Sequence, residues 1–594
     1  MLTVRRVMGT ETEYALLDAA RSNLDPQELS VNLLRTWEIS AADSLPSSLQ
    51  GPDPDSPLEE RRLVMGAGCR FDYSGEHPER DERGFEQQDL PAQARTNDEL
   101  GAVLTGAQAR WVQKVNKFEA HYYRGNATHL PNGARLYIDH THPEYATPEC
   151  LGPDETVLHE LAGDYLMEQA GQALAQVNAP DGRPYQPVLI KNNTDGKGAA
   201  WGAHENYLVK RETDWETIVQ VMLPFLVSRP IIGGAGRIGI GEHSEQNGFQ
   251  IFQRADYIEE EVSLFTTHQR PIVNTRDEPH CSPHSYRRFH LTTADSLVLM
   301  EPRTLCLGIP AVVLDLIEKE PEIAKRLAEQ YALADPVAAI KQISHDTTLQ
   351  TQCQLKAGGT ASALQIQEGF LRACQQVGAA DEQTQQTLTH WQSTLDKLSQ
   401  GWQQAATCVQ WCAKLALWDK MRQRYPCDFN DPRIVAADLQ FSMLGKTSLA
   451  RIWAKAKGIV PLKSEQELEE ALAHGSASTR SGGRARLFTA FPNRVWAASW
   501  TSWLLDIDRD LLLRVQLPNP YHPTAQEVEK ALVGVKTGKD SRGEDLLVAL
   551  RRLGLEIPEE LTTVGWDEGF YADGAFGKDG PVTASPQTDE SIGE

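Results

Sequence analysis

The stretch NGARLYIDHTHPEYATPE, residues 132–149, has the pattern of a β-strand followed by a turn. Its first half alternates Arg135, Tyr137 and Asp139, so on a β-strand all three side chains point to one face. The turn that follows can bring Glu144 back towards that face. An arginine, a phenol and carboxylates are costly to bury together without a ligand, although a polar edge strand would show the same pattern. The stretch predicts a strand and a turn that carry part of a binding face.

A second pair of acids lies in GTETEY, residues 9–14, within a strand expected from Val4 to Leu17. Glu11 and Glu13 are two residues apart, so they share one face of that strand. Two neighbouring carboxylates repel each other unless a cation lies between them. A hard divalent ion with oxygen ligands fits this pair, and a solvated strand face would also account for it.

A glycine-rich loop follows in DGKGAAWGAHENY, residues 195–207. Its glycines allow the backbone to approach a phosphate closely. His204 and Asn206 then project together from the strand expected after the loop. His204 is a candidate metal ligand beside the distant glutamates, although a lone histidine is more often a satisfied core residue.

Clustered basic residues occupy two further strand-like segments. The first holds Arg276 and His280, and the second holds Arg287, Arg288 and His290. The chain carries a formal net charge of -24, so clustered arginines indicate an anionic partner, and a polyphosphate suits them. Internal salt bridges with the surplus carboxylates are the alternative.

The bulk composition narrows the class of protein. A net charge of -24 over 594 residues predicts that the surface repels nucleic acid and acidic membranes. No run approaches the roughly 18 apolar residues that a membrane span needs, and the N-terminus lacks an apolar segment typical of a signal peptide. Nine scattered cysteines indicate a reducing compartment, so we expect a cytoplasmic protein without a nucleic-acid or membrane partner.

The periodicity predicts how the chain is organised. A catalytic domain is expected over residues 1–428, a small C-terminal domain over 429–545 and a disordered tail over 560–594. Within these, we expect an inserted loop region at about 40–131 with a helical patch near 100–118, helices at 156–177 and over about 309–425, and one alternating strand at 494–508.

Five strings together resemble one known family. They are GTETEY (9–14), NGARLYIDHTHPEYATPE (132–149), KNNTDGKGAAWGAHENYL (191–208), LPFLVSRPIIGGAGRIGIG (223–241) and NTRDEPH (274–280). They resemble the family of the Pup ligase and the Pup deamidase/depupylase, which is related to glutamine synthetase and gamma-glutamyl-cysteine ligase. The resemblance runs, with gaps, from about residue 4 to 540. It implies an α+β fold in which helices back a glutamine synthetase-like antiparallel sheet cradle, with a small C-terminal domain.

The family has two branches. The ligase couples the C-terminal glutamate of Pup to a lysine using ATP, whereas the other branch hydrolyses that isopeptide bond or converts a terminal Gln of Pup to Glu. DHTHPEY, DGKGAAWG and FDYSGEHPERDERGFE (71–86) resemble the second branch. The resemblance implies a hydrolase that acts on a Pup-like protein tag and tagged protein substrates. A ligase and a non-catalytic scaffold that binds nucleotide or tag are the alternatives.

The resemblance also assigns roles to residues, with ATP and Mg²⁺ as cofactors. Asp139 matches the catalytic aspartate, and it would either attack the amide carbonyl or activate water. ATP is expected to serve mainly as a bound cofactor, and Arg480 and Arg484 are expected to face the nucleotide or the tag. The implied magnesium ligands are Glu11, Glu13, Tyr137, Glu144, His204 and His290, and the implied ATP contacts are Arg135, Thr147, Asn206, Arg288 and Trp500.

One segment departs from the family pattern. The family usually reads Gly-Asp-x-Asn followed by a glutamate, where this chain has Ala294 to Leu297 and then Met300. The lost amide and carboxylate are expected near the nucleotide, where their loss would weaken catalysis or mark a relative acting on a different ubiquitin-like tag.

Overall fold

The computed structural model describes residues 1–43, 69–71, 76–86, 111–113, 127–243, 248–459, 463–508 and 511–557. Most of the expected insertion at 40–131 and the whole expected tail at 560–594 lie outside these residues. The predictions for those two segments therefore stay predictions. The family fold expected from the sequence is present, as the sheet and its helices show.

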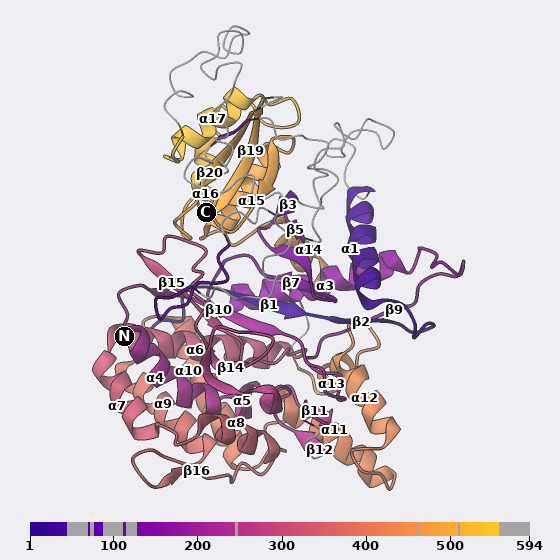
Figure 1. The fold of residues 1–594 in the computed structure, drawn as a ribbon, viewed down its shortest axis with the longest axis vertical. Helices are drawn as coiled ribbons and strands as arrows, with labels where there is room; N and C mark the ends of the chain where they lie inside the picture. The colour runs from indigo at the N-terminus through magenta and orange to yellow at the C-terminus, as the bar shows by residue number, and fades with distance from the viewer. Residues whose placement is uncertain are drawn as a thin grey trace, which may run out of the picture.

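A twelve-stranded sheet runs through the centre of the molecule (Figure 1). Its catalytic half has the order β15 (Tyr286–Leu291), β10 (Ala203–Lys210), β1 (Val7–Glu13), β7 (His142–Ala146), β6 (Arg135–Asp139) and β5 (Ala127–His129), with β8 (Cys150–Leu151) also on β1. These strands pair antiparallel. Buried residues alternate along most of β10 with half-buried ones, which is the pattern of a strand with one face in the core.

The sheet continues into the C-terminal part of the chain. Its order there is β3 (Cys69–Phe71), β18 (Val495–Ala498), β19 (Ser502–Asp508), β20 (Leu511–Gln516) and β4 (Trp111–Gln113). β3 pairs antiparallel with β5 and parallel with β18. A short strand of the inserted region thus joins the catalytic strands to the C-terminal strands.

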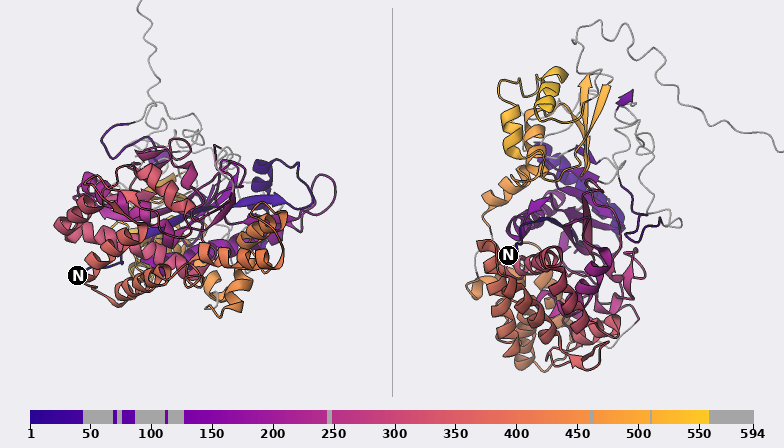
Figure 2. Two further views of the ribbon diagram at one scale, coloured as in Figure 1. Left: turned by 90° about the horizontal axis from the view of Figure 1, so that it is seen from below. Right: turned by 90° about the vertical axis from the view of Figure 1, so that its left-hand side faces the viewer.

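Helices cover the sheet on the side drawn below it in Figure 1 and in the right view of Figure 2. α3 (Pro153–Leu174) lies against β1 and α6 (Met300–Lys319). A methyl group at Gly163 of α3 would come within 2.3 Å of the Tyr145 ring, so this glycine lets the helix approach β7. Asp214 caps α4 (Trp215–Ser228) by accepting a hydrogen bond of 2.8 Å from the Thr217 backbone.

The remaining elements complete this layer and its margins. They are β2 (Ala15–Asp18), α1 (Pro26–Asp43), β9 (Pro187–Ile190), α5 (Pro230–Gly233), β11 (Arg237–Gly239), β12 (Gly248–Gln250), the 3₁₀ helix η4 (Ala255–Tyr257), β13 (Glu260–Ser263), β14 (Pro271–Asn274), α7 (Pro321–Tyr331), α8 (Pro336–His345), β16 (Cys353–Gln354), β17 (Thr360–Ala361), α9 (Ala363–Val377), α10 (Glu382–Ser399), α11 (Gln410–Arg424), α12 (Pro432–Ser442), α13 (Leu449–Ala456), α14 (Glu465–Ala473), α15 (Arg480–Ala490), α16 (Ala525–Ala531) and α17 (Gly543–Arg552).

The described residues form three hydrophobic cores, and the two largest of them meet well after residue 429 in the sequence. Buried residues of α12, α13 and α14 belong to the larger core with α4, α6 and α9. The smaller of these two is built from α15, α16, α17 and strands β18 to β20, and it includes Cys69 of β3. We call residues 480–557 the C-terminal unit. The sequence-based boundary between folding domains stays a prediction.

Local structure differs from the sequence prediction at three places. The strand expected over Val4 to Leu17 is two strands, β1 and β2, separated at Tyr14, whose hydroxyl donates to Asp164 of α3. The segment 494–508 forms β18 and β19, because Ser499 to Thr501 make a turn. Residues 111–113 are strand β4 instead of part of a helical patch, since they pair with β20.

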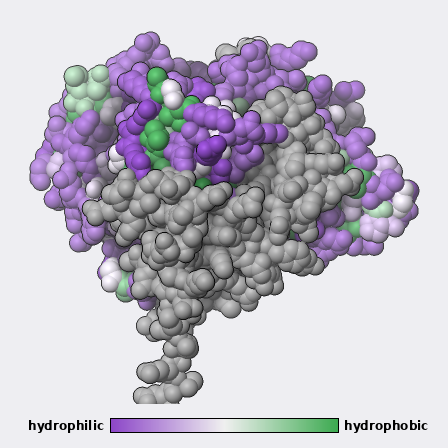
Figure 3. All heavy atoms as spheres, turned by 90° about the horizontal axis from the view of Figure 1, so that it is seen from above, coloured by the Kyte–Doolittle hydropathy of each residue, from purple (hydrophilic) through white to green (hydrophobic). Residues whose placement is uncertain are grey.

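The described surface agrees with the acidic, polar composition. Hydrophilic side chains cover most of the described face in Figure 3. Among the described residues, no helix combines the length and apolar character that crossing a bilayer requires.

Candidate functional site

Strand register brings the predicted site residues together from distant parts of the chain. Glu11 on β1 lies opposite His204 on β10, and Glu13 lies opposite Glu144 on β7. On the outer strands, His290 of β15 pairs with Asn206, and Tyr137 of β6 pairs with Glu144. Because residues in register project to the same side of a sheet, these side chains share one face.

One cluster consists of Glu11, His204 and His290, whose potential ligand atoms lie within 4.8 Å of one another. His204 Nδ1 is 2.9 Å from Glu11 Oε2. Burial lowers the pKa of His290, so its imidazole is neutral and able to bind a metal. Burial alone would raise the pKa of Glu11, but the hydrogen bond from His204 and the nearby positive charges hold it well below its usual value. This donor set fits a divalent cation.

A second cluster consists of Glu13, Asp139 and Glu144, again within 4.8 Å. Burial, followed by the charge of Glu13, raises the pKa of Glu144 well above its usual value. Three crowded carboxylates form the kind of oxygen site that Mg²⁺ prefers. Tyr137 lies beside them, and burial together with Glu144 raises the pKa of its phenol well above the usual range.

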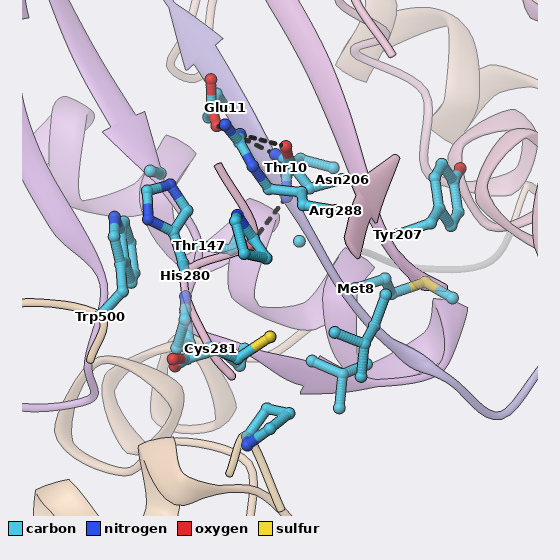
Figure 4. Close-up of a pocket in the computed structure, with 18 of the residues that line it drawn as sticks. Met8, Thr10, Glu11, Thr147, Asn206, Tyr207, His280, Cys281, Arg288 and Trp500 are labelled. Atoms are coloured by element: carbon cyan, nitrogen blue, oxygen red, sulfur yellow. Dashed lines mark hydrogen bonds and ion pairs between the residues drawn. The ribbon is translucent and has the colours of Figure 1, made fainter. Parts of the chain in front are cut away.

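A cavity opens beside the first cluster, between β1, β10 and the C-terminal unit (Figure 4). Of the predicted ATP contacts, Thr147, Asn206, Arg288 and Trp500 line it. Arg288 reaches towards the metal cluster, with Nη1 2.8 Å from Asn206 Oδ1 and 3.6 Å from Glu11 Oε1. Arg288 therefore places a positive charge between the candidate metal site and the cavity.

The fifth predicted ATP contact, Arg135, is not among the described residues that line this cavity. Its guanidinium lies between two aromatic rings, 4.1 Å from the centroid of Phe71 and 4.0 Å from that of Tyr137. Nη1 is 3.3 Å from Glu76 Oε1. Arg135 is thus held beside the carboxylate cluster by residues of the inserted region.

Two histidines, His140 and His142, lie beside the carboxylates, and His140 was not singled out from the sequence. His140 Nδ1 lies 2.9 Å from Asp139 Oδ1, at a residue whose φ of 53° is in the left-handed region. Burial would raise the pKa of Asp139, but His140 holds it below its usual value. His142 Nδ1 lies 3.3 Å from Glu13 Oε2, and its ring stacks on Trp201. The position of His140 directly after Asp139 in DHTHPE is the signal that could have indicated it.

Leu297 and Met300, which differ from the family pattern, are not among the described residues that line the cavity. Leu297 is buried in the larger core and Met300 begins α6 and packs against that core. Both side chains pack in or against an apolar core, and the expected effect of this departure on the nucleotide stays a prediction.

The two arginines expected to face the nucleotide or the tag lie at the C-terminal side of the cavity. Arg480 lines it, and Arg484 is completely buried one helical turn further along α15. Both pair with Glu149 at the opposite wall, at 2.7 Å and 3.1 Å. Glu149 was not singled out from the sequence.

Known proteins match almost the whole chain. The family model described as Pup-ligase protein matches residues 6–504. A relative from Mycobacterium tuberculosis (strain ATCC 25618 / H37Rv), named Pup deamidase/depupylase, is 35% identical over 537 residues, covering 90% of this chain and 97% of its own length. A relative from Acidimicrobium ferrooxidans, named Pup–protein ligase, is 33% identical over 447 residues, covering 74% of this chain and 94% of its own length.

Two solved structures share the fold. The complex between the prokaryotic ubiquitin-like protein Pup and its ligase PafA matches with a TM-score of 0.67 at 24% identity, covering 96% of this chain and 97% of that one. The Pup ligase PafA in complex with ADP matches with a TM-score of 0.60 at 28% identity, covering 70% and 93%. The strand register, the clusters it assembles and these matches lead to one conclusion: the chain belongs to the Pup-ligase family.

Proposed function

We propose that this protein is an ATP- and Mg²⁺-dependent hydrolase that removes a Pup-like tag from lysines, deamidates the C-terminal Gln of the tag, or does both. One observation carries the choice of branch. The relative named Pup deamidase/depupylase aligns over 90% of the chain, whereas the relative named Pup–protein ligase aligns over 74%. The tag and tagged proteins are accordingly its partners.

The donor sets support Mg²⁺ and ATP as cofactors. Glu11, His204 and His290 in one cluster, and Glu13 and Glu144 in the other, offer nitrogen and oxygen ligands from four strands. The lowered pKa of His290 and the raised pKa of Glu144 both fit a site that is completed by a cation. Magnesium in this position would neutralise phosphate charge and position the nucleotide.

The residues around the cavity suit a nucleoside triphosphate. Arg288 supplies positive charge beside the first cluster, while Trp500 provides an aromatic surface and Thr147 a hydroxyl. That the ligase PafA was solved in complex with ADP supports nucleotide binding in this family. In the hydrolase, the nucleotide acts mainly as a bound cofactor.

Asp139 is the proposed catalytic residue. Its pKa, held below the usual value by His140, keeps the carboxylate ionised, so it can attack the amide carbonyl carbon or remove a proton from water. His140 orients the carboxylate through the contact between Nδ1 and Oδ1. Attack by Asp139 would expel the lysine amine, or ammonia, and form a mixed anhydride that water then hydrolyses, which restores Asp139. In the other route Asp139 takes a proton from the attacking water and the departing nitrogen is protonated as the bond breaks. Both routes consume one water and leave the tag with a free carboxylate.

Incubation with a Pup-tagged substrate tests this proposal. Cleavage of the tag in the presence of ATP or of a non-hydrolysable analogue is the expected result. Conjugation that requires hydrolysable ATP would instead identify a ligase, the function of the second relative. Tag binding with neither reaction would identify a scaffold.

We also place the protein in the cytoplasm. All nine cysteines lie in the described residues and are free, and eight of them are buried. Free thiols in this number suit a reducing compartment. Fractionation of the native cell would check this placement, and recovery of the protein outside the cytoplasm would contradict it.

A further inference from the structure

The carboxylate of Glu149 joins the wall of the cavity to the C-terminal unit. Glu149 lies between β7 and β8 and lines the cavity with Thr147. Only 12% of its side chain is exposed. Its Oε1 accepts from Arg480 Nε at 2.7 Å and its Oε2 from Arg484 Nη1 at 3.1 Å. One nearly buried carboxylate thus holds two buried guanidiniums that lie one turn apart on α15.

The backbone of Glu149 makes a second set of contacts with the same helix. Its carbonyl oxygen accepts hydrogen bonds from Thr479 Oγ1 at 2.7 Å and from Ser481 Oγ at 2.9 Å. Thr479 is also the N-cap of α15. The start of this helix is therefore tied to Glu149 by both side-chain and main-chain groups.

The two arginines also donate hydrogen bonds to backbone carbonyls of other segments, two of which line the cavity. Arg480 donates to the carbonyl of His280 and, at 2.6 Å, to that of Leu517. Arg484 Nη2 donates to the carbonyl of Trp500 at 2.9 Å. His280 and Trp500 both line the cavity (Figure 4). The position of these two rings thus depends on arginines whose shared partner is Glu149.

Electrostatics favour this arrangement only while all three groups stay together. Burial alone would raise the pKa of Glu149, but Arg484 and Arg480 hold it at about 2, so the carboxylate is ionised at neutral pH. Charge-assisted hydrogen bonds of this kind are stronger than neutral ones. Without the carboxylate, two buried guanidiniums would repel each other next to the cavity.

We propose that Glu149 is a positioning residue that couples nucleotide binding to the seating of α15 and the C-terminal unit on the catalytic sheet. A nucleotide in the cavity contacts both sides of this junction and so stabilises it. The seated unit in turn holds Trp500 and His280 against the nucleotide, because linkage between two equilibria is reciprocal. The inference rests on the proposed nucleotide binding.

Glu149→Gln tests the coupling, since it keeps the shape of the side chain and removes its charge. We expect the KM for ATP to rise about tenfold or more, as for the loss of a charge-assisted hydrogen bond, while kcat at saturating ATP changes less than about twofold. In hydrogen exchange of the full chain, ATP should slow exchange of the α15 amides in the wild type and do so less in the variant.

Glu155→Gln is the matched control. Glu155 also binds the segment just before the C-terminal unit, because its Oε2 accepts a hydrogen bond of 2.6 Å from Ser476 Oγ. It is not among the described residues that line the cavity. Its KM for ATP should stay at the wild-type value. If Glu149→Gln does not fold, Arg484→Lys serves in its place, because a lysine cannot hold Glu149 and the Trp500 carbonyl together.

The outcomes separate the two proposals. A wild-type protein that binds no ATP would overturn the proposed nucleotide function. A wild type that binds ATP, with an unchanged KM and unchanged α15 protection in Glu149→Gln or Arg484→Lys, would overturn the coupling alone. An equal rise of KM in Glu155→Gln would also overturn it, since the effect would then be structural.

Discussion

Glu13 of β1 and Glu144 of β7 lie directly opposite each other in the antiparallel register, and both are buried. Two buried carboxylates on facing strands repel, and the raised pKa of Glu144 records that repulsion together with burial. A sheet that places them in register is stable only when a proton or a cation offsets the charge. This pair is therefore where metal binding and stability are linked.

Glu144→Gln should separate metal binding from folding. We expect the variant without metal to be at least as stable as the wild type, because the repulsion from Glu13 is removed. The wild type should gain about 2.7 kcal/mol when Mg²⁺ is at 100 times its Kd, and the variant should gain much less at the same concentration. Thermal unfolding with EDTA and with increasing Mg²⁺ measures both effects. Full stabilisation of the variant by Mg²⁺ would rule out Glu144 as a ligand.

Asp139→Asn should abolish turnover and leave ATP binding intact. The amide can neither attack a carbonyl nor accept a proton, so we expect a loss of about 10²–10⁴-fold or more in kcat. Cleavage of a tagged substrate measures turnover, and calorimetric titration with ATP confirms that the cavity is formed. Wild-type turnover in this variant would refute the catalytic assignment.

Arg135→Lys should weaken activity through the loss of two aromatic contacts. The Arg135 guanidinium lies over the rings of both Phe71 and Tyr137, and the compact ammonium of a lysine cannot reproduce both contacts. Contacts of this kind are each worth about 0.5–2 kcal/mol, so we expect kcat/KM for the tagged substrate to fall about tenfold. Arg83→Lys is the matched control, because Arg83 also lies over a ring, Phe85, but pairs with Asp81. Equal losses in the two variants would contradict a specific role.

Asp295→Asn should change how stability depends on pH. Burial raises the pKa of Asp295 from its ordinary value of 3.8 to about 6, so the folded state holds this proton more tightly than the unfolded state. The stability that this proton contributes is complete below pH 3.8 and is lost as pH rises through 6. Between pH 5 and 7.5 the wild type should lose about 1–2 kcal/mol relative to the variant. Urea unfolding of both proteins at pH 5 and at pH 7.5 measures these free energies. The same change with pH in the wild type and in the variant would contradict the prediction.

Alternation along a strand was enough to predict much of the candidate site. Arg135, Tyr137 and Asp139 form one strand as expected, and Glu11 lies beside His204 with the predicted partner His290. The residues implied as magnesium ligands by the family resemblance fall at two candidate clusters, one about Glu11 and one about Glu13 of β1. Asp139 belongs to the second, which strand alternation alone does not reveal.

The positions of Leu297 and Met300 show what a comparison of motifs does not predict. A comparison of motifs predicts the residue types that differ, but not the direction in which each side chain points. Both side chains pack into the larger core, because burying apolar surface outweighs any position implied by the motif.

The sequence alone predicted the strands that carry the candidate site, the residues that share a face of each strand and the family, because these follow from local periodicity and from ordered motifs. Only the tertiary structure decided that β3 of the inserted region joins the two halves of the sheet, that Phe71 stacks on Arg135, and that Glu149 holds Arg484. These contacts connect residues 58 to 427 positions apart in the chain. They depend on how complete elements pack together, and no local pattern in the chain encodes that packing.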